Sequence, residues 1–318
     1  MSTLPADLTA HEHASLLQLQ QIPIDNVISS IDQGLLYLPS YRELYYRWER
    51  QQWQTQEIDF IPDRLQWEMM TDEEQHDHLF AMASFFQGEA SVADALSPYV
   101  IAMPDEEMRF FVTTQLVDEA RHTVFFARFF NEVMGIDEGS LEETLALARN
   151  YMNEPMRYVL VDSLIDIADR LRTNPQNLAL LVEGVSLYHI IVEGTMALAG
   201  QRNLLERFRR ENLFPGFRGG FTAVARDESR HVIFGVTFLR QMLQENPDFS
   251  EVIRATLSKF APLALQSLTP PDSAIPGMLA TREDPWLVAR YALVSLRKKL
   301  KVIGLQMELP EVPPLPAF

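Results

Sequence analysis

Two stretches of the chain carry the same charged pentapeptide. Gln115–Val124 reads QLVDEARHTV and Ala223–Val232 reads AVARDESRHV, so that Asp-Glu-x-Arg-His occurs twice. Both copies lie in apolar surroundings with helical periodicity. Burial of Asp, Glu, Arg and His together is costly unless they are paired or bind a metal. The repeat therefore favours a metal site over a solvated cluster of ions.

The glutamate and the histidine of each copy lie three positions apart. They are Glu119 with His122, and Glu228 with His231. On a helix this spacing brings both side chains to one face. A carboxylate oxygen and an imidazole nitrogen on one face can hold one divalent ion, so each copy predicts half of a metal site.

Two such pairs leave two metal ions short of ligands, and helical bundles complete these sites with one Glu from each of two further helices. Glu89 and Glu193 are single carboxylates in apolar segments. In an antiparallel helix hairpin, residues equidistant from the turn sit at the same height. The midpoint of Glu89 and Glu119 is Pro104, and the midpoint of the second pair lies just before a break at Asn212–Gly216. The predicted ligands are therefore Glu89, Glu119, His122, Glu193, Glu228 and His231.

The other charged residues of the pentapeptides are expected to support the ligands. A metal-bound His usually donates its second N–H to a carboxylate. We expect Asp118 and Asp227 to accept these bonds, each from the His of the opposite helix, with Arg121 and Arg230 neutralising them. Four carboxylates and two imidazoles suit iron or manganese, and the ligand types alone do not exclude zinc.

The composition limits the class of protein. The chain has 318 residues with 47% apolar and 22% charged side chains, which suits a globular protein with a sizeable core. A net charge of −17 makes nucleic acid a poor partner. The absence of cysteine excludes disulfides, zinc–thiolate sites, iron–sulfur clusters and thiol catalysis. No signal peptide and no run of about twenty apolar residues is visible, so we expect a cytoplasmic protein that does not span a membrane.

Helical patterning without strand alternation predicts an all-α fold. A capping box at Thr71–Glu74 opens a helix that we expect to end near Ser97. Pro98 and Pro104 are expected to bracket the break, with Pro104 in the first turn of the next helix. The other predictions are helices at about 41–53, up to 134, 140–172, up to 212, 217–244 and 285–302, a segment at 1–30 that is loosely structured at its start, and an extended Pro-rich tail at about 308–318.

The ligand pattern resembles the ferritin-like di-metal carboxylate oxidases and, within them, the small subunit of ribonucleotide reductase. The resemblance covers about residues 71–240. It implies a four-helix bundle core with flanking helices, one ferritin-like domain over residues 1–318, and a homodimer. Radical-bearing reductase subunits commonly have a tyrosine four positions after the first His. Here that residue is Phe126, which excludes a stable tyrosyl radical at this position.

Two further residues resemble a different branch of that superfamily. Val92 lies three positions after Glu89, and Tyr188 lies five positions before Glu193. This pair is similar to that of the ribonucleotide reductase small-subunit-like ligand-binding oxidases, in which a Val and a Tyr become joined by an ether bond. That family holds a manganese/iron centre and a long-chain fatty acid whose carboxylate reaches the metals. The resemblance implies an O₂-activating oxidase in which Val92 and Tyr188 react.

A lipid ligand would need an apolar cavity beside the metals. Small residues near the ligands could leave room for an alkyl chain: Ala120, Gly194, Ala197 and Gly200. Larger residues that could line such a cavity are Phe85, Phe125, Phe129, Met196 and Leu198.

The alternatives stay within the same architecture. One is a metal-only ribonucleotide reductase small subunit that docks a large catalytic subunit. Another is a di-iron acyl desaturase or N-oxygenase, with two iron ions in place of the mixed centre. A non-enzymatic iron store is disfavoured, because ferritin cages use shorter chains.

Overall fold

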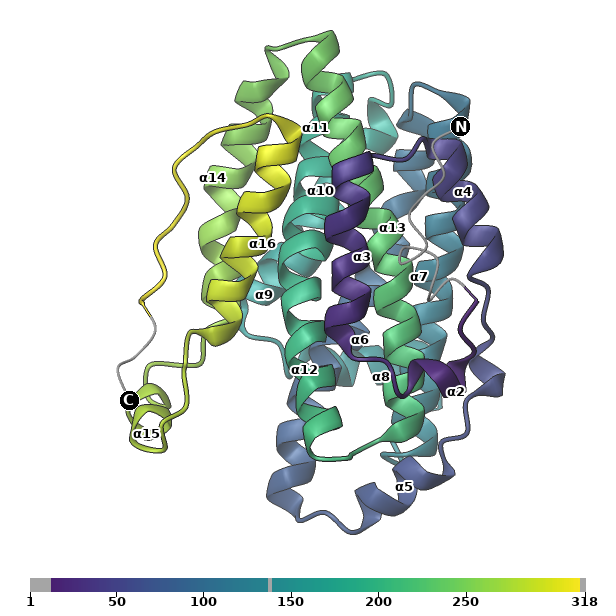
Figure 1. Ribbon diagram of the computed structural model, residues 1–318, viewed down its shortest axis with the longest axis vertical. Coiled ribbons are helices and arrows are strands. Elements are labelled where there is room, and N and C mark those ends of the chain that lie inside the picture. The colour runs from purple at the N-terminus through teal and green to yellow at the C-terminus, as the bar shows by residue number, and fades with distance from the viewer. Residues whose placement is uncertain (1–12, 137–138, 315–318) are drawn as a thin grey trace.

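The computed structural model describes residues 13–136 and 139–314, and the regular elements in these ranges are helices (Figure 1). In chain order they are α2 (Leu16–Leu19), α3 (Ile24–Tyr37), α4 (Tyr41–Arg50), η1 (Thr55–Glu57), α5 (Ile61–Glu68), α6 (Asp72–Ala102), α7 (Glu106–Glu132), α8 (Leu141–Arg149), α9 (Glu154–Arg157), η2 (Tyr158–Asp162), α10 (Ser163–Thr173), α11 (Leu178–Val185), η3 (Ser186–Ala197), α12 (Leu198–Arg210), α13 (Pro215–Glu245), α14 (Phe249–Ser267), α15 (Ile275–Ala280) and α16 (Leu287–Ile303). The predicted all-α class is thereby confirmed for the described part of the chain.

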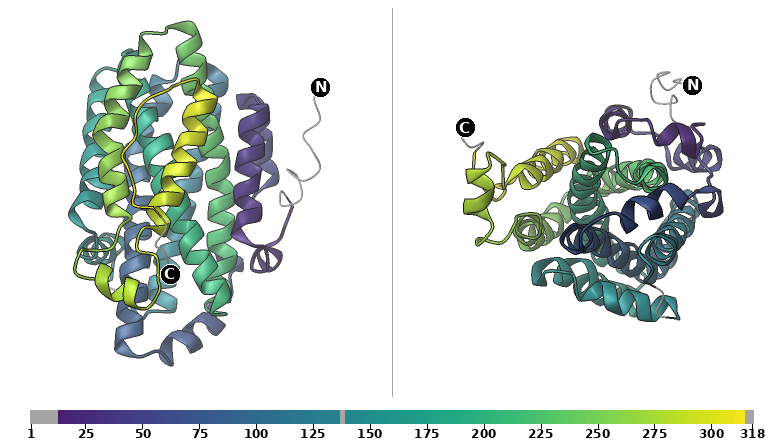
Figure 2. Two further views of the ribbon diagram at one scale, coloured as in Figure 1. Left: turned by 60° about the vertical axis from the view of Figure 1, so that its left-hand side comes forward. Right: turned by 90° about the horizontal axis from the view of Figure 1, so that it is seen from below.

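A bundle of long helices forms the centre of the molecule (Figure 2). α6 packs against α7, and η3 and α12 pack against α13. α3 and α4 flank the bundle beside α13 and α7, α10 covers α6, and α14 and α16 cover η3. Four helices that carry the predicted ligands are thus enclosed by flanking helices.

The first central helix begins as predicted and ends later. Thr71 caps α6, with its side chain and that of Glu74 bonded reciprocally to the backbone. The helix continues through Pro98 to Ala102, so the prediction that it ends near Ser97 was wrong. A proline inside a helix removes one hydrogen bond. Pro98 is buried, and packing of this turn against the core offsets that loss.

The start of the second central helix was also misplaced. Pro104 precedes α7 and does not lie in its first turn. Asp105 is the N-cap, and its side chain accepts from the backbone N–H groups of Glu107 and Met108. A capping carboxylate fixes a helix start strongly, and here it sets the boundary one residue after the proline.

The N-terminal segment contains two helices within the described range, α2 and α3. Residues 1–12, on which the expected loose start falls, lie outside the described range. Ile24, Val27, Ile28 and Ile31 are buried on one face of α3. These apolar positions recur every three or four residues, which is the spacing of an amphipathic helix. α3 uses this face to pack against α13.

The helix predicted to end near residue 212 is not α-helical throughout. Its middle third, η3, is a π-helix between α11 and α12. The whole run Leu178–Arg210 is long and apolar enough to cross a membrane, but 83% of its most apolar window is buried inside the protein. It is therefore accounted for as a core helix. The described part of the predicted extended tail, up to residue 314, contains no helix.

Candidate metal centre

The structure brings the six predicted ligand residues together. Glu89 comes from α6, Glu119 and His122 from α7, Glu193 from η3, and Glu228 and His231 from α13. They form two groups, in each of which the donor atoms lie within 4.8 Å of one another: Glu89, Glu119, His122 and Glu228, and Glu119, Glu193, Glu228 and His231. Glu119 and Glu228 belong to both groups, so two ions bound there would share these residues.

Both imidazoles point the same nitrogen at the cluster. His122 Nδ1 lies 3.3 Å from Glu89 Oε2, and His231 Nδ1 lies 3.4 Å from Glu193 Oε1. Each Nε2 faces an aspartate of the opposite pentapeptide, His122 at 3.3 Å from Asp227 and His231 at 3.2 Å from Asp118. An N–H on Nε2 leaves the Nδ1 lone pair free for a metal.

Charged and aromatic side chains hold these aspartates in place. The guanidinium groups of Arg121 and Arg230 each bond to both carboxylates. Two indoles, which the sequence analysis did not single out, also donate: Trp48 Nε1 to Asp118 at 2.9 Å and Trp53 Nε1 to Asp227 at 2.8 Å. Both tryptophans lie in the aromatic stretch Tyr41–Trp53, but nothing in its spacing indicates their partners.

The pKa shifts within the cluster fit a candidate cation site. Burial raises the pKa of Glu89 to about 8. Burial also opposes the charge of Glu119, yet the hydrogen bond and charge of His122 together with the charge of His231 lower its pKa to about 2. The neighbouring carboxylates outweigh burial at both histidines and raise their pKa values well above the usual range. Protons on Glu89 and the two histidines therefore compensate negative charge that bound metal ions would compensate instead.

Several atoms of the cluster are buried without a hydrogen-bond partner among the described residues. They are Oε2 of Glu119, Glu193 and Glu228, and Nδ1 of His231. An unsatisfied buried acceptor is costly, so each such atom needs an explanation. Two divalent ions would satisfy all of them. Four carboxylates and two imidazoles fit iron or manganese in type and in number.

Tyr188 lies directly beside the cluster. Its buried hydroxyl donates to Glu119 Oε1 at 2.8 Å. It also accepts from Gln115 Nε2 at 3.0 Å, and the same nitrogen donates to Glu193 Oε1 at 2.9 Å. Gln115 and its neighbour His189 complete a buried network that sequence reasoning missed, since a Gln four positions before a ligand is unremarkable without its contacts.

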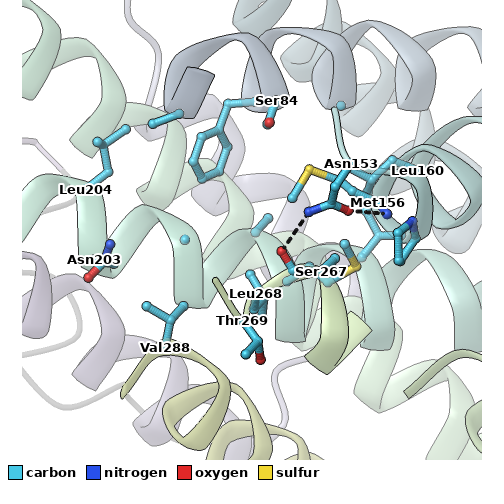
Figure 3. Close-up of a pocket in the computed structure, with 18 of the residues that line it drawn as sticks. Ser84, Asn153, Met156, Leu160, Asn203, Leu204, Ser267, Leu268, Thr269 and Val288 are labelled. Atoms are coloured by element: carbon cyan, nitrogen blue, oxygen red, sulfur yellow. Dashed lines mark hydrogen bonds between the residues drawn. The ribbon is translucent and has the colours of Figure 1, made fainter. Parts of the chain in front are cut away.

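A cavity of about 680 Å³ leads from the surface to the glutamates. Val92 and all four glutamates lie in its inner lining, and exposed Asn203, Gln266 and Asp272 lie in its outer lining. Apolar side chains such as Leu160, Leu204 and Val288 are among the lining residues (Figure 3). The described lining residues include five carboxylates and no Lys, Arg or His: Glu89, Glu119, Glu193, Glu228 and Asp272.

The expected lining was right for about half of its residues. Phe85, Met196, Ala197 and Gly200 line the cavity, whereas Ala120, Phe125, Phe129, Gly194 and Leu198 are not among its lining residues in the described chain. Phe125 and Phe129 pack against Phe217 instead. At Gly194 a Cβ would lie 2.7 Å from Lys299 Cε, so this glycine accommodates a lysine rather than a ligand.

Phe126 occupies the position where a radical tyrosine would stand. It is fully buried and packs against the rings of Phe86 and Phe221. The described part of the chain thus has a hydrocarbon ring at this position.

A family model matches the part of the chain that carries the site. Its description is ribonucleotide reductase, small chain, and the match spans residues 37–264. The chain belongs to this family.

Solved structures relate this ribonucleotide reductase small-chain family member to a particular fold. An R2-like ligand-binding oxidase, as a valine-to-isoleucine variant with an anaerobically reconstituted Mn/Fe cofactor, is 24% identical and has a TM-score of 0.72. A tyrosine-to-phenylalanine variant with an aerobically reconstituted Mn/Fe cofactor is 23% identical, also with a TM-score of 0.72. Each match covers 83% of this chain and 93% of that chain. The likeness shows a shared all-α, ferritin-like fold.

Proposed function

We propose that this protein is an O₂-activating oxidase with one manganese and one iron ion, which binds a long-chain fatty acid and joins Val92 to Tyr188 by an ether bond. One observation carries the proposal: a lipid-sized cavity ends at the glutamates, with Val92 in its lining and the Tyr188 hydroxyl bonded to Glu119. Bound at Glu89, Glu119, His122, Glu193, Glu228 and His231, the two ions would supply a place for O₂ reduction and two electrons toward it.

The residues of the chain account for the rest of the reaction. The Cβ–H bond of Val92 and the O–H bond of Tyr188 break, and a Cβ–O bond forms. Two protons and two electrons leave. With the two electrons from the metal ions and two further protons from solvent, O₂ would be reduced to two molecules of water. Glu119 accepts the hydrogen bond of the phenol and so fixes the direction in which the phenolic proton points. Burial of Val92 and Tyr188, with exposed fractions of 4% and 2%, keeps bulk water from the reacting atoms.

The cavity supports a fatty acid rather than a neutral lipid. Its middle is apolar and suits an alkyl chain. With no cationic side chain in the described lining, only the metal ions remain to bind a carboxylate at the inner end. Mass spectrometry of an organic extract should therefore find a long-chain fatty acid in metal-loaded protein. Extracts without lipid from several expression hosts would contradict this part of the proposal.

Peptide mapping tests the cross-link. After loading with both metals under reducing conditions and exposure to air, the Val92 and Tyr188 peptides should migrate as one species lighter by two hydrogens. Metal-free protein and Tyr188→Phe are the controls, because the variant loses one hydroxyl and retains the ligands. Separate, unmodified peptides from the fully loaded wild type would refute the oxidase.

Anomalous scattering tests the identity of the metals. In protein loaded with both metals it should find manganese with Glu89, Glu119 and His122, and iron at the other position.

The alternative is a metal-only ribonucleotide reductase small subunit, which family membership favours. The oxidase uses the oxidation inside the site, whereas a reductase subunit passes it to a large subunit. Stimulation of ribonucleotide reduction by an added large subunit, with Val92 and Tyr188 unlinked, would favour the alternative. We further propose that residues 1–318 form one ferritin-like domain and that the protein is a cytoplasmic homodimer.

A further inference from the structure

Gln115 has an amide whose orientation is fixed by its surroundings. It lies on α7, one turn before Glu119, and is fully buried. Its Nε2 donates to Glu193 Oε1 at 2.9 Å, and its Oε1 lies 3.1 Å from His189 Nε2. The hydrogen bonds place the NH₂ group toward Glu193 and Tyr188 and the carbonyl oxygen toward His189. A metal-bound Glu193 would be an ionised carboxylate, which only accepts hydrogen bonds and would keep this orientation. A carbonyl oxygen in turn needs a donor, which assigns a proton to His189 Nε2.

His189 is built to remain in that form. It is fully buried, and its Nδ1 has no hydrogen-bond partner among the described residues, so a second proton there would be an unsatisfied charge. Burial and the charge of His231 lower its pKa well below the usual range. The ring is also held tightly, because a Cβ at Gly235 would lie 2.2 Å from His189 Cβ. A neutral, immobile imidazole therefore presents one N–H to Gln115.

The amide transmits this choice to Tyr188. Because Gln115 donates to the phenol oxygen, the phenol proton points to Glu119 Oε1 at 2.8 Å. With the amide reversed, the carbonyl oxygen would face both Tyr188 and Glu193. The phenol proton would then point to Gln115 Oε1. The same oxygen would face Glu193 Oε1, and two acceptor oxygens without a proton between them repel each other.

We propose that His189 and Gln115 form a positioning relay, in which the N–H of His189 sets the Gln115 amide and the amide directs the phenol proton of Tyr188 to Glu119. Neither residue reacts. The inference rests on the proposed function for its consequence, the Val92–Tyr188 bond, because that bond needs the phenol oxygen to lose its proton inside the site. The hydrogen bonds themselves stand independently of that reaction.

Four variants test the relay. His189→Phe removes the donor and keeps a ring, and Gln115→Leu removes the amide. His189→Gln restores a side-chain N–H donor and serves as the rescue. His78→Phe is the matched control, because His78 is also buried, on α6, and packs against Phe208 and Phe214 outside the network.

The first measurement does not depend on oxidation. Full-length protein carrying ¹³Cζ-tyrosine is loaded with zinc, which binds the same ligand types and has no redox chemistry. The Tyr188 signal, identified by its loss in Tyr188→Phe, reports the hydrogen bonds of the phenol. It should shift in His189→Phe and Gln115→Leu, return toward the wild-type position in His189→Gln, and stay in place in His78→Phe. An unmoved signal in His189→Phe overturns the relay.

The second measurement follows the cross-link at equal manganese and iron content. Its rate of formation should fall about ten-fold in His189→Phe and Gln115→Leu, the size of effect that loss of one buried hydrogen bond produces. It should be unchanged in His78→Phe. A shifted signal with an unchanged rate overturns the positioning role. If the variants shift as expected but the wild type never forms the bond, the result supports the relay and refutes the proposed oxidase.

Discussion

The helices that carry Glu89 and Glu193 present the same ligand to the cluster but surround it differently. Five positions before the glutamate, Ser84 on α6 lines the cavity, whereas Tyr188 on η3 fills the space with a phenol bonded to Glu119. The first segment is α-helical and the second is π-helical. At this position one side thus contributes to the cavity, and the other holds a buried phenol.

The residues that flank the two pentapeptides also differ. Four positions before the glutamate stands Gln115 in the first copy and the apolar, buried Val224 in the second. Four positions after the histidine stand Phe126 and Gly235, and only the glycine allows the close approach of His189. Equal spacing of the glutamate and histidine in unequal surroundings means that the two halves of the cluster are not equivalent.

The largest expected effect concerns the residues that both halves share. Glu119→Ala and Glu228→Ala each remove a carboxylate from both groups, so elemental analysis should find one ion per chain or fewer instead of two. Glu89→Ala and Glu193→Ala should each weaken one position. Glu132→Ala, an exposed glutamate at the end of α7, is the control. Wild-type metal content in both Glu119→Ala and Glu228→Ala would contradict the assignment of these two glutamates as ligands shared by both halves.

The next prediction asks which group holds the ligand. Metal removal should weaken fatty-acid binding by about a hundred-fold, since the described cavity lining offers carboxylates but no cationic side chain. By linkage, a fatty acid should raise the affinity for the metals by the same factor. Titration calorimetry measures both. A fatty alcohol of equal length should bind metal-free and metal-loaded protein alike, and equal binding of the acid to both forms would contradict a metal-held carboxylate.

Metal affinity should also rise with pH. Glu89, with a pKa raised to about 8, and the two histidines carry protons at neutral pH that a metal must displace. Below about pH 8 protons compete with the metal, so affinity should fall by about ten-fold per pH unit for each proton displaced. Calorimetry in two buffers of different ionisation enthalpy counts these protons. An affinity that stays constant with pH would show that the ligands are already deprotonated.

The smallest effect concerns the shape of the cavity. A Cβ at Gly200 would lie 2.7 Å from Phe85 Cζ. Gly200→Val should push this ring into the cavity, reduce the amount of co-purified lipid, and lower the free energy of unfolding by about 1–3 kcal/mol. Metal content should not change. Gly277→Ala, which meets nothing within 4 Å, is the control, and an unchanged lipid content in Gly200→Val would place the alkyl chain elsewhere.

The sequence located the cluster better than its surroundings. Helical spacing and hairpin symmetry sufficed to group Glu89, Glu119 and Glu193, because both follow from regular geometry. The contacts of Trp48 and Gln115 could not be predicted in this way, because a hydrogen bond between distant segments depends on where two helices cross. The capping box at Thr71 was confirmed, since the capping partners are local. The helix end predicted before Pro98 was wrong, because packing of this buried turn outweighed the local effect of a proline.

The π-helical segment Ser186–Ala197 has a consequence for comparing this chain with its relatives. In a π-helix the hydrogen bonds join residues five apart, one residue more than in an α-helix. Tyr188 and Glu193, which are five residues apart, therefore both face Gln115. A relative whose equivalent segment is purely α-helical can be aligned on Glu193 or on Tyr188, but not on both without a gap. A single-codon insertion or deletion here would move the phenol around the helix while leaving the ligand in place, and gap placement in this segment decides whether an alignment assigns the tyrosine to other family members.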